Sequence, residues 1–118
     1  TFTTTLFIQI LEVLVNKHFQ ELRVFNTVCK SIEQRVNAAG AIVKNVDCML
    51  IIGGKMSANT RRLYEACLEN NRNSYHVEAK EDIKKDMMCG CTRVGITAGA
   101  STPDWIVRDI TRFIETYP

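Results

Sequence analysis

Three short stretches of the sequence place small polar residues directly after apolar runs. They read NTVC at 26–29, GGKMSAN at 53–59 and AGASTPD at 98–104. The first ends in a lone cysteine, Cys29, and the others carry hydroxyl and amide side chains, among them Ser57, Asn59 and Ser101. If each stretch joins a strand to a helix, its side chains lie beside the unpaired N–H groups and the positive dipole end of a helix N-terminus. Such a place favours an anion, above all a phosphate.

Helix capping is the competing interpretation of these turns. Serine, threonine and asparagine are the preferred N-caps, so capping alone explains any single turn. For three polar turns on one edge of a sheet, two interpretations stay open. The turns form one shared anion site, or each turn only caps its own helix. Lys55, Arg61 and Arg62 add positive charge near the second turn. The glycines match neither GxxxxGK[ST] nor GxGxxG, which disfavours nucleotide binding by those two routes.

Cys29 differs from the other cysteines in its position. A helix N-terminus lowers the pKa of a thiol, so Cys29 is a candidate nucleophile or metal ligand. Cys48 and Cys67 lie in apolar periodic runs and are expected in the core. Two thiols as close in sequence as Cys89 and Cys91 seldom chelate one metal without further ligands. Five cysteines without disulfide-framework spacing indicate a reducing cytoplasm.

Alternating strand and helix patterns position the three turns. Helices are predicted over 5–20, 31–44, 60–70, 81–88 and 103–116, and strands over 23–28, 48–54, 74–79 and 92–99. This alternation implies right-handed crossovers and a parallel sheet, whose ligands bind beyond the carboxyl ends of the strands. The sequence therefore predicts an α/β fold, a small three-layer unit with a mainly parallel four-stranded sheet. Residues 1–21 are expected to be a helix of a preceding α/β module, and residues 22–118 the C-terminal module.

The composition excludes several classes of protein. With 118 residues, 46% hydrophobic and 24% charged, the chain has the make-up of one globular domain. A net charge of +2 is too small to indicate binding to nucleic acid or an anionic membrane. No apolar run is long enough for a membrane span. Because the chain starts with Thr1 and runs at once into an apolar segment, we expect it to be part of a longer polypeptide.

Four stretches together resemble one enzyme family. They read FNTVCKSIEQR, LIIGGKMSANTRRL, SYHVEA and RVGITAGASTPDWIV, and cover nearly the whole chain in order. They resemble the carboxy-terminal part of 4-hydroxy-3-methylbut-2-enyl diphosphate reductase, an iron–sulfur oxidoreductase of the non-mevalonate isoprenoid pathway. TAGASTPDW and GGKMSANTRRL are the most specific parts. The resemblance implies three α/β modules around one 4Fe–4S cluster, each supplying one cysteine, with two of the three cysteines upstream of this chain.

The resemblance also implies roles for individual residues. Cys29 matches the last cluster cysteine, in the NTxC…R motif. Ser57 and Asn59 match the SxN element that holds the substrate diphosphate. Ser101 matches the serine of TAGAS, which binds the same group.

The amino-terminal TTTL stretch resembles a threonine-bearing turn near the hydroxyl end of the substrate, with Thr4 and Thr5 as candidate catalytic residues. The chain departs from the family pattern at a few positions. They are Thr3 for a usual glutamine, Ser31-Ile32 for Ala-Thr, Val36 for glutamine, and Ala58 for a second serine. The change at Ala58 removes one possible hydrogen bond to phosphate.

For the whole enzyme, the resemblance implies reductive loss of the substrate's hydroxyl, giving isopentenyl and dimethylallyl diphosphates, with one cluster iron open as a Lewis acid. The implied partners are a small diphosphate substrate, an electron donor such as ferredoxin or flavodoxin, and the upstream domains, with neither nucleic acid nor membrane. One cysteine cannot hold a 4Fe–4S cluster, so the chain alone is expected to fold but to be inactive. The alternative is a stand-alone phosphate-binding α/β module without catalysis.

Overall fold

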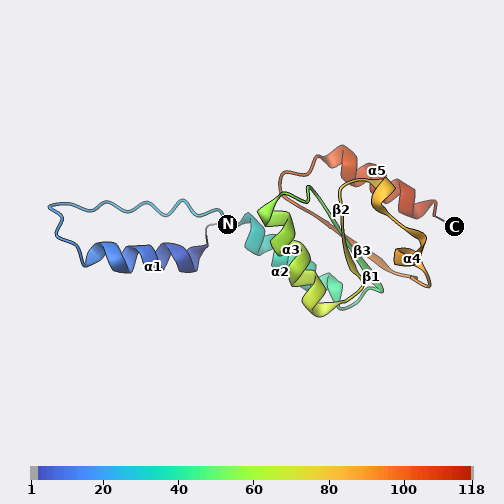
Figure 1. Ribbon diagram of the computed structural model, residues 1–118, viewed down its shortest axis with the longest axis horizontal. Helices are drawn as coiled ribbons and strands as arrows, with labels where there is room; N and C mark the ends of the chain where they lie inside the picture. The colour runs from blue at the N-terminus through green and yellow to red at the C-terminus, as the bar shows by residue number, and fades with distance from the viewer. Residues whose placement is uncertain (1–2, 118) are drawn as a thin grey trace. The chain divides into compact units, whose positions relative to one another are not determined.

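The chain forms two compact units, Thr1–Lys30 and Ser31–Pro118 (Figure 1). This computed structural model describes residues 3–117. The first unit holds helix α1 (Thr4–Val15) and the irregular segment that follows it. The helices of the second unit are α2 (Ser31–Val43), α3 (Ala58–Asn70), α4 (Lys85–Met88), α5 (Asp104–Glu115) and the 3₁₀ helix η1 (Lys80–Asp82). Its strands are β1 (Cys48–Ile52), β2 (Ser74–Val77) and β3 (Val94–Ala98).

Helix α1 has a capped start and an early end. Thr3 is its N-cap, with the hydroxyl oxygen accepting a hydrogen bond from the Leu6 amide at 3.2 Å. Asn16 ends the helix, because its side chain donates to the Glu12 carbonyl at 2.7 Å and its backbone amide donates to Leu14. The helix therefore stops before the predicted end at residue 20. Its apolar residues are largely exposed, among them Leu6, Ile8, Ile10, Val13 and Val15.

The predicted strand at 23–28 does not form. Within residues 3–117 the sheet has three strands, and the expectation of four is wrong for this part of the chain. Val24 is 46% exposed and Phe25 is 76% exposed. Branched and aromatic residues favour strands because they pack on a neighbouring strand and a covered face. Neither is present beside Val24 and Phe25 in this unit, so the local pattern is not enough to make a strand.

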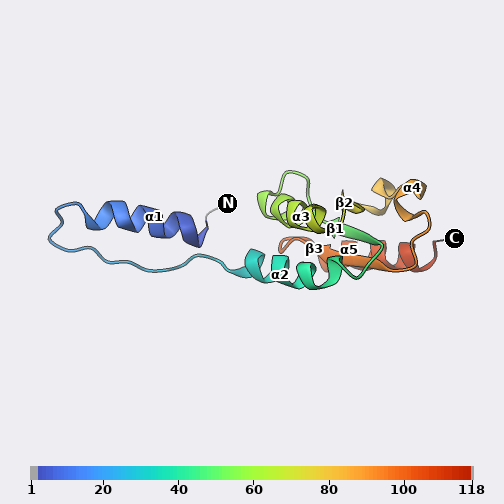
Figure 2. The ribbon, with the colours of Figure 1, turned by 90° about the horizontal axis from the view of Figure 1, so that it is seen from below.

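The remaining α/β prediction is confirmed, since the three strands are parallel and lie in the order β2-β1-β3. In the central strand β1, Met49 is aligned with Ser74 of β2 and with Gly95 of β3. Every residue of β1 is buried, as expected for a strand with helices on both faces. Helices α2 and α3 lie side by side on one face of the strands (Figures 1 and 2), and α5 lies on the other (Figure 1).

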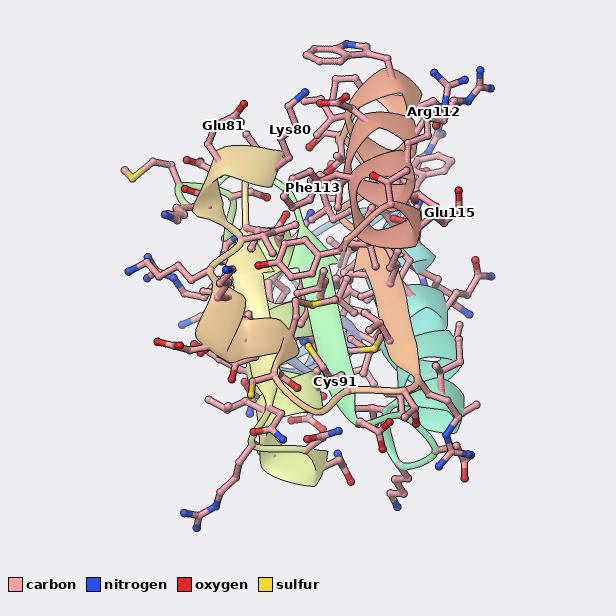
Figure 3. The ribbon with its side chains drawn as sticks, turned by 90° about the vertical axis from the view of Figure 1, so that its right-hand side faces the viewer. Lys80, Glu81, Cys91, Arg112, Phe113 and Glu115 are labelled. Atoms are coloured by element: carbon pink, nitrogen blue, oxygen red, sulfur yellow. The ribbon has the colours of Figure 1, made fainter. Side chains whose placement is uncertain are left out.

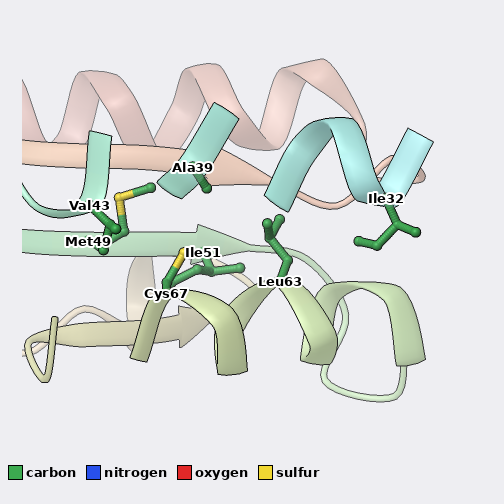
Figure 4. Packing of buried hydrophobic residues seen from close by; sticks show 7 residues of the cluster. All are labelled: Ile32, Ala39, Val43, Met49, Ile51, Leu63 and Cys67. Atoms are coloured by element: carbon green, nitrogen blue, oxygen red, sulfur yellow. The ribbon is translucent and has the colours of Figure 1, made fainter. Parts of the chain in front are cut away.

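Two hydrophobic cores form on the opposite faces of the sheet. On the α2 and α3 face, Met49 and Ile51 pack with buried helix residues (Figure 4), which are Ile32, Ala39, Val43, Leu63 and Cys67. On the other face, Cys48, Leu50 and Ile52 pack against Ile110 of α5 and its neighbours. Burial raises the pKa of the Cys48 thiol to about 12, with a smaller contribution from Cys91, and burial also raises the pKa of Cys67. Both thiols are core residues, as the sequence predicts.

Helix α5 is attached to the sheet by apolar packing and to η1 by an ion pair. Phe113 lies on the side of α5 that faces the strands (Figure 3) and packs against the core. Lys80 Nζ of η1 lies 3.1 Å from Asp109 Oδ2 of α5. Within residues 3–117, no helix is both long enough and apolar enough to cross a membrane.

Candidate anion-binding site

The turn after β1 ends in an exposed helix N-terminus. Ser57 is the N-cap of α3, and its Oγ accepts a hydrogen bond from the Thr60 amide at 3.3 Å. The amides of Ala58 and Asn59 have no hydrogen-bond partner among residues 3–117. A serine hydroxyl that accepts one bond can still donate its own proton. The turn therefore offers two backbone N–H groups and one O–H group to a ligand.

The turn after β3 is built differently. The N-cap of α5 is Pro103, and no side chain caps this helix. The Thr102 hydroxyl donates instead to the carbonyl of Ile52 at the end of β1, at 3.0 Å. Ser101 is exposed, and within the described residues its hydroxyl makes no hydrogen bond. Capping therefore accounts for Ser57 but leaves the presence of Ser101 unexplained.

Close packing of Thr60 and Thr102 on two glycines holds these turns together. A Cβ atom on Gly53 would lie 2.8 Å from Thr60 Oγ1 and 2.9 Å from Thr102 Oγ1. A Cβ atom on Gly99 would also clash with Thr60 Oγ1 and would lie 3.3 Å from Thr102 Oγ1. Only glycine permits this approach, and the φ of +153° at Gly53 also favours glycine. We call residues 53–59 and 99–102 the two-turn cradle.

Residues of β2 and its extension brace the first turn of the cradle. His76 Nε2 lies 2.8 Å from the Gly53 carbonyl oxygen, and since a carbonyl can only accept, Nε2 carries the proton. Glu78 Oε1 accepts a hydrogen bond from the Lys55 amide at 2.7 Å. No sequence motif marks His76 and Glu78 as site residues. Their spacing of two in a predicted strand, which puts both on one face, is the signal that could have found them.

The charges around the cradle are mixed. Lys55 Nζ lies 4.0 Å from Asp82 Oδ2. The pKa of Asp82 is lowered mainly by the hydrogen bond from the Glu78 amide, with smaller contributions from the Ala79 amide, Lys55 and His76. Beside β2 there is a cavity of about 620 Å³, lined by Lys55, Arg61, Tyr64, Glu65, Tyr75, His76 and Met87. It contains none of the three predicted diphosphate-binding residues.

The N-terminus of α2 lies at the same edge of the sheet. Arg35, in the second turn of α2, donates through Nη1 to the Ala98 carbonyl at the carboxyl end of β3, at 2.9 Å. Ile32 is 7% exposed and packs at the arrowhead end of β1 (Figure 4). The N-termini of α2, α3 and α5 therefore meet at the carboxyl ends of the strands, as expected for ligand sites in parallel sheets.

The predicted site residues are divided between the two units. The second unit contains Ser57, Asn59 and Ser101, and brings their two turns together. The first unit contains Cys29, whose side chain is exposed, and the two candidate threonines, Thr4 and Thr5. Thr4 and Thr5 open helix α1 rather than lying in a turn. Over residues 3–117, no three His, Cys, Asp or Glu side chains meet in a way that could hold a metal ion.

Comparison with known proteins links this site to one family. The family model described as LytB protein matches residues 1–115. A 4-hydroxy-3-methylbut-2-enyl diphosphate reductase from Caldanaerobacter subterraneus subsp. tengcongensis is 45% identical over 107 residues, which are 91% of this chain and 37% of that relative. The reductase of the same name from Aquifex aeolicus is 46% identical over 91 residues, 77% of this chain and 32% of the relative. The chain spans well under half the length of these relatives.

Solved structures agree with this match. The structure of an (E)-4-hydroxy-3-methyl-but-2-enyl diphosphate reductase, described as the terminal enzyme of the non-mevalonate pathway, has 39% sequence identity and a TM-score of 0.81. It covers 98% of this chain, which corresponds to 41% of that protein. A reductase structure from Plasmodium falciparum has a TM-score of 0.74 at 19% identity, which shows the fold alone. The chain belongs to the LytB protein family.

Proposed function

We propose that this chain is the part of a 4-hydroxy-3-methylbut-2-enyl diphosphate reductase that binds the substrate diphosphate and supplies one ligand to a 4Fe–4S cluster. The names of the relatives support the activity. The observation that carries the proposal is the two-turn cradle, in which Thr60 and Thr102 join two polar turns at the carboxyl edge of the sheet.

The cradle suits a diphosphate because it presents donors and few acceptors. The amides of Ala58 and Asn59 point out of the first turn of α3, where the helix dipole also favours negative charge. The hydroxyls of Ser57 and Ser101 and the side-chain amide of Asn59 add three further donors. Hydrogen bonds to a charged group contribute more than neutral ones, so a few such donors hold an anion without a paired cation.

Cys29 fits a single cluster ligand. Its thiol is exposed, and it precedes Ser31, the first residue of α2, by two positions. Two residues span at most roughly 7 Å, so the chain tethers the Cys29 backbone near the N-terminus of α2. A cluster bound there would supply a Lewis-acidic iron and electrons for removing the substrate's hydroxyl group. Two further cysteines would come from upstream domains, and electrons from a donor such as ferredoxin or flavodoxin in the cytoplasm.

Within this proposal, Cys29 would hold iron as a thiolate while the cradle would fix the opposite end of the substrate. Thr4 and Thr5 would lie near the substrate's hydroxyl group. Reductive removal of the hydroxyl group would need a fixed substrate, because two electrons and two protons would have to reach that group for it to leave as water. The contribution of Ser57, Asn59 and Ser101 is therefore positioning through the non-reacting diphosphate.

Titration calorimetry with inorganic pyrophosphate tests the binding role in the 118-residue chain. Ser101→Ala and Asn59→Ala are expected to weaken binding by roughly tenfold each, since each removes a hydrogen bond to a charged group. Asn70→Ala is the matched control, because Asn70 lies at the other end of α3 and donates to Ala66. Absence of pyrophosphate binding by the wild-type chain would contradict the proposed role.

A chimera separates the reductase from a stand-alone phosphate-binding module. In this chimera, the chain replaces the region of the Caldanaerobacter reductase that matches it over 107 residues. We expect the chimera to hold a cluster and reduce the substrate, and Cys29→Ser to remove activity and cluster iron while leaving pyrophosphate affinity unchanged. A folded chimera that keeps its cluster iron after Cys29→Ser would exclude Cys29 as a ligand.

A further inference from the structure

The hydroxyl of Thr60 is buried without a hydrogen bond. Thr60 is 1% exposed, and its Oγ1 has no hydrogen-bond partner in the described part of the chain. Buried polar atoms in native proteins are nearly always paired, and an unpaired hydroxyl destabilises the folded state. Valine would fill similar space without this penalty. The hydroxyl therefore needs an explanation other than packing.

The position of this hydroxyl gives the explanation. Thr60 is the third residue of α3, and its backbone amide is already bound by the N-cap Ser57. Its Oγ1 occupies the space that side chains of Gly53 and Gly99 would take. These glycines begin the two turns of the cradle, so the hydroxyl lies against both turns at once.

We propose that Thr60 is a further binding residue of the diphosphate site, and that its hydroxyl forms its missing hydrogen bond when an anion occupies the two-turn cradle. The acceptor is an oxygen that the anion brings with it, either its own or that of a hydrating water. This inference rests on the proposed function, because it assumes that the cradle binds a diphosphate. It adds a donor at the base of the cradle to the hydroxyls of Ser57 and Ser101 at its surface.

Two substitutions of Thr60 distinguish a binding role from a packing role. Thr60→Val keeps the shape of the side chain and removes the hydroxyl, so the free chain should unfold at the same temperature or a higher one. Its affinity for inorganic pyrophosphate should fall by roughly tenfold or more. Thr60→Ser keeps the hydroxyl and loses a buried methyl group, so it should unfold at a lower temperature yet keep most of its affinity. If Thr60 had only a packing role, each substitution would change the unfolding temperature and the pyrophosphate affinity in the same direction.

The measurements are thermal unfolding and titration calorimetry with inorganic pyrophosphate on the 118-residue chain. Thr111→Val is the matched control, because the Thr111 hydroxyl already donates to the Val107 carbonyl at 2.7 Å in α5. It should leave the affinity unchanged. Wild-type affinity in Thr60→Val, together with weaker binding in Ser101→Ala, would overturn this inference and leave the proposed function standing. Absence of binding by the wild-type chain would overturn both.

Discussion

At the scale of single residues, Ser57 and Ser101 look equivalent in sequence but have different surroundings. Ser57 caps α3 and could also bind a ligand, whereas Ser101 caps nothing. The amino-acid sequence alone does not separate these roles, since the residue types that cap helices are also those that bind phosphate. The difference depends on where α5 begins, and Pro103 decides that by taking the N-cap position.

Ser57→Asp is expected to separate capping from anion binding. Aspartate caps a helix about as well as serine, so the free energy of unfolding should stay within about 0.5 kcal/mol of the wild type. Its negative charge should abolish pyrophosphate binding, because it repels the anion at the helix N-terminus. Urea unfolding and titration calorimetry measure the two effects. Undiminished pyrophosphate affinity would show that the anion does not approach Ser57.

Ala58→Ser is expected to strengthen binding. Ala58 is the exposed first residue of α3, beside Ser57 and Asn59. A hydroxyl there can donate to the anion, and a hydrogen bond to a charged group contributes about 1.5–3 kcal/mol. Calorimetry with pyrophosphate should show a lower Kd than for the wild type. Ala66→Ser, on the same helix but away from the cradle, serves as the control and should not change Kd.

At the scale of elements, the sequence predicts the helices and the central strands well because their apolar patterns are satisfied within the unit. The five-residue strand β1 is an uninterrupted apolar run and is wholly buried. The predicted strand at 23–28 fails because its branched residues have no partner strand to pack against. The spacing of His76 and Glu78 predicts that both lie on one face of a strand. Their contacts with the first turn of the cradle depend on the alignment of β2 with β1, which the sequence does not give.

Glycine substitutions test the close packing inside the cradle. Gly99→Ala is expected to destabilise the fold by about 1–3 kcal/mol, because its Cβ would overlap Thr60. Gly40→Ala is the matched control in α2, where a Cβ meets no atom within 4 Å. It should stabilise the fold by about 0.5–1 kcal/mol through helix propensity. Urea unfolding measures both changes, and equal effects would argue against the overlap.

Asp47 ties β1 to β3 at the opposite edge of the sheet and is expected to make stability depend on pH. Its Oδ2 accepts hydrogen bonds from the amides of Thr92 and Arg93, at 2.9 and 2.8 Å, and from the Thr92 hydroxyl. The Arg93 amide, followed by Thr92, lowers the pKa of Asp47 below its ordinary value of 3.8. A lowered pKa stabilises the fold above that ordinary value, and the stabilisation is lost as pH falls through the folded pKa.

Asp47→Asn should therefore lower the urea midpoint at pH 7, because the amide loses the charge-assisted bonds. The difference between the variant and the wild type should shrink when the titration is repeated in acid near and below pH 3.8. Asp86→Asn removes the same charge from an exposed residue of α4 and is the control, whose urea midpoint at pH 7 should stay close to that of the wild type. A difference that stays constant with pH would mean that Asp47 acts only through its shape.

At the scale of the whole molecule, the polar turns that follow β1 and β3 are predictable from sequence, but their assembly into one cradle is only partly so. The cradle unites two turns that are separated by residues 60–98, and the buried residue that joins them, Thr60, has no distinguishing sequence signal. The structure describes Cys29 in a separate unit from the cradle. The proposed role of Cys29 as a cluster ligand therefore rests on the family match and on its position two residues before α2 in the chain.

The chain alone is expected to hold no stable 4Fe–4S cluster. Cluster assembly needs about three or four thiolates at one place, and Cys29 offers one. Anaerobic reconstitution with iron and sulfide, followed by iron analysis and visible spectroscopy, should give iron far below four atoms per chain. Cys29→Ser should not change that low value. Near-stoichiometric cluster iron in the isolated chain would contradict the proposed division of ligands.

The filling of two glycine positions by one threonine also limits how this sequence can diverge. An alanine at Gly99 is tolerable only after the residue at Thr60 has become smaller, whereas at Gly53 the Thr102 hydroxyl and the positive φ exclude alanine as well. Substitutions at residues 60 and 99 should accordingly be accepted in a fixed order during evolution, with the helix position changing first. Homologues should thus show covariation between these two positions, although they lie far apart along the chain, and should keep the glycine at position 53.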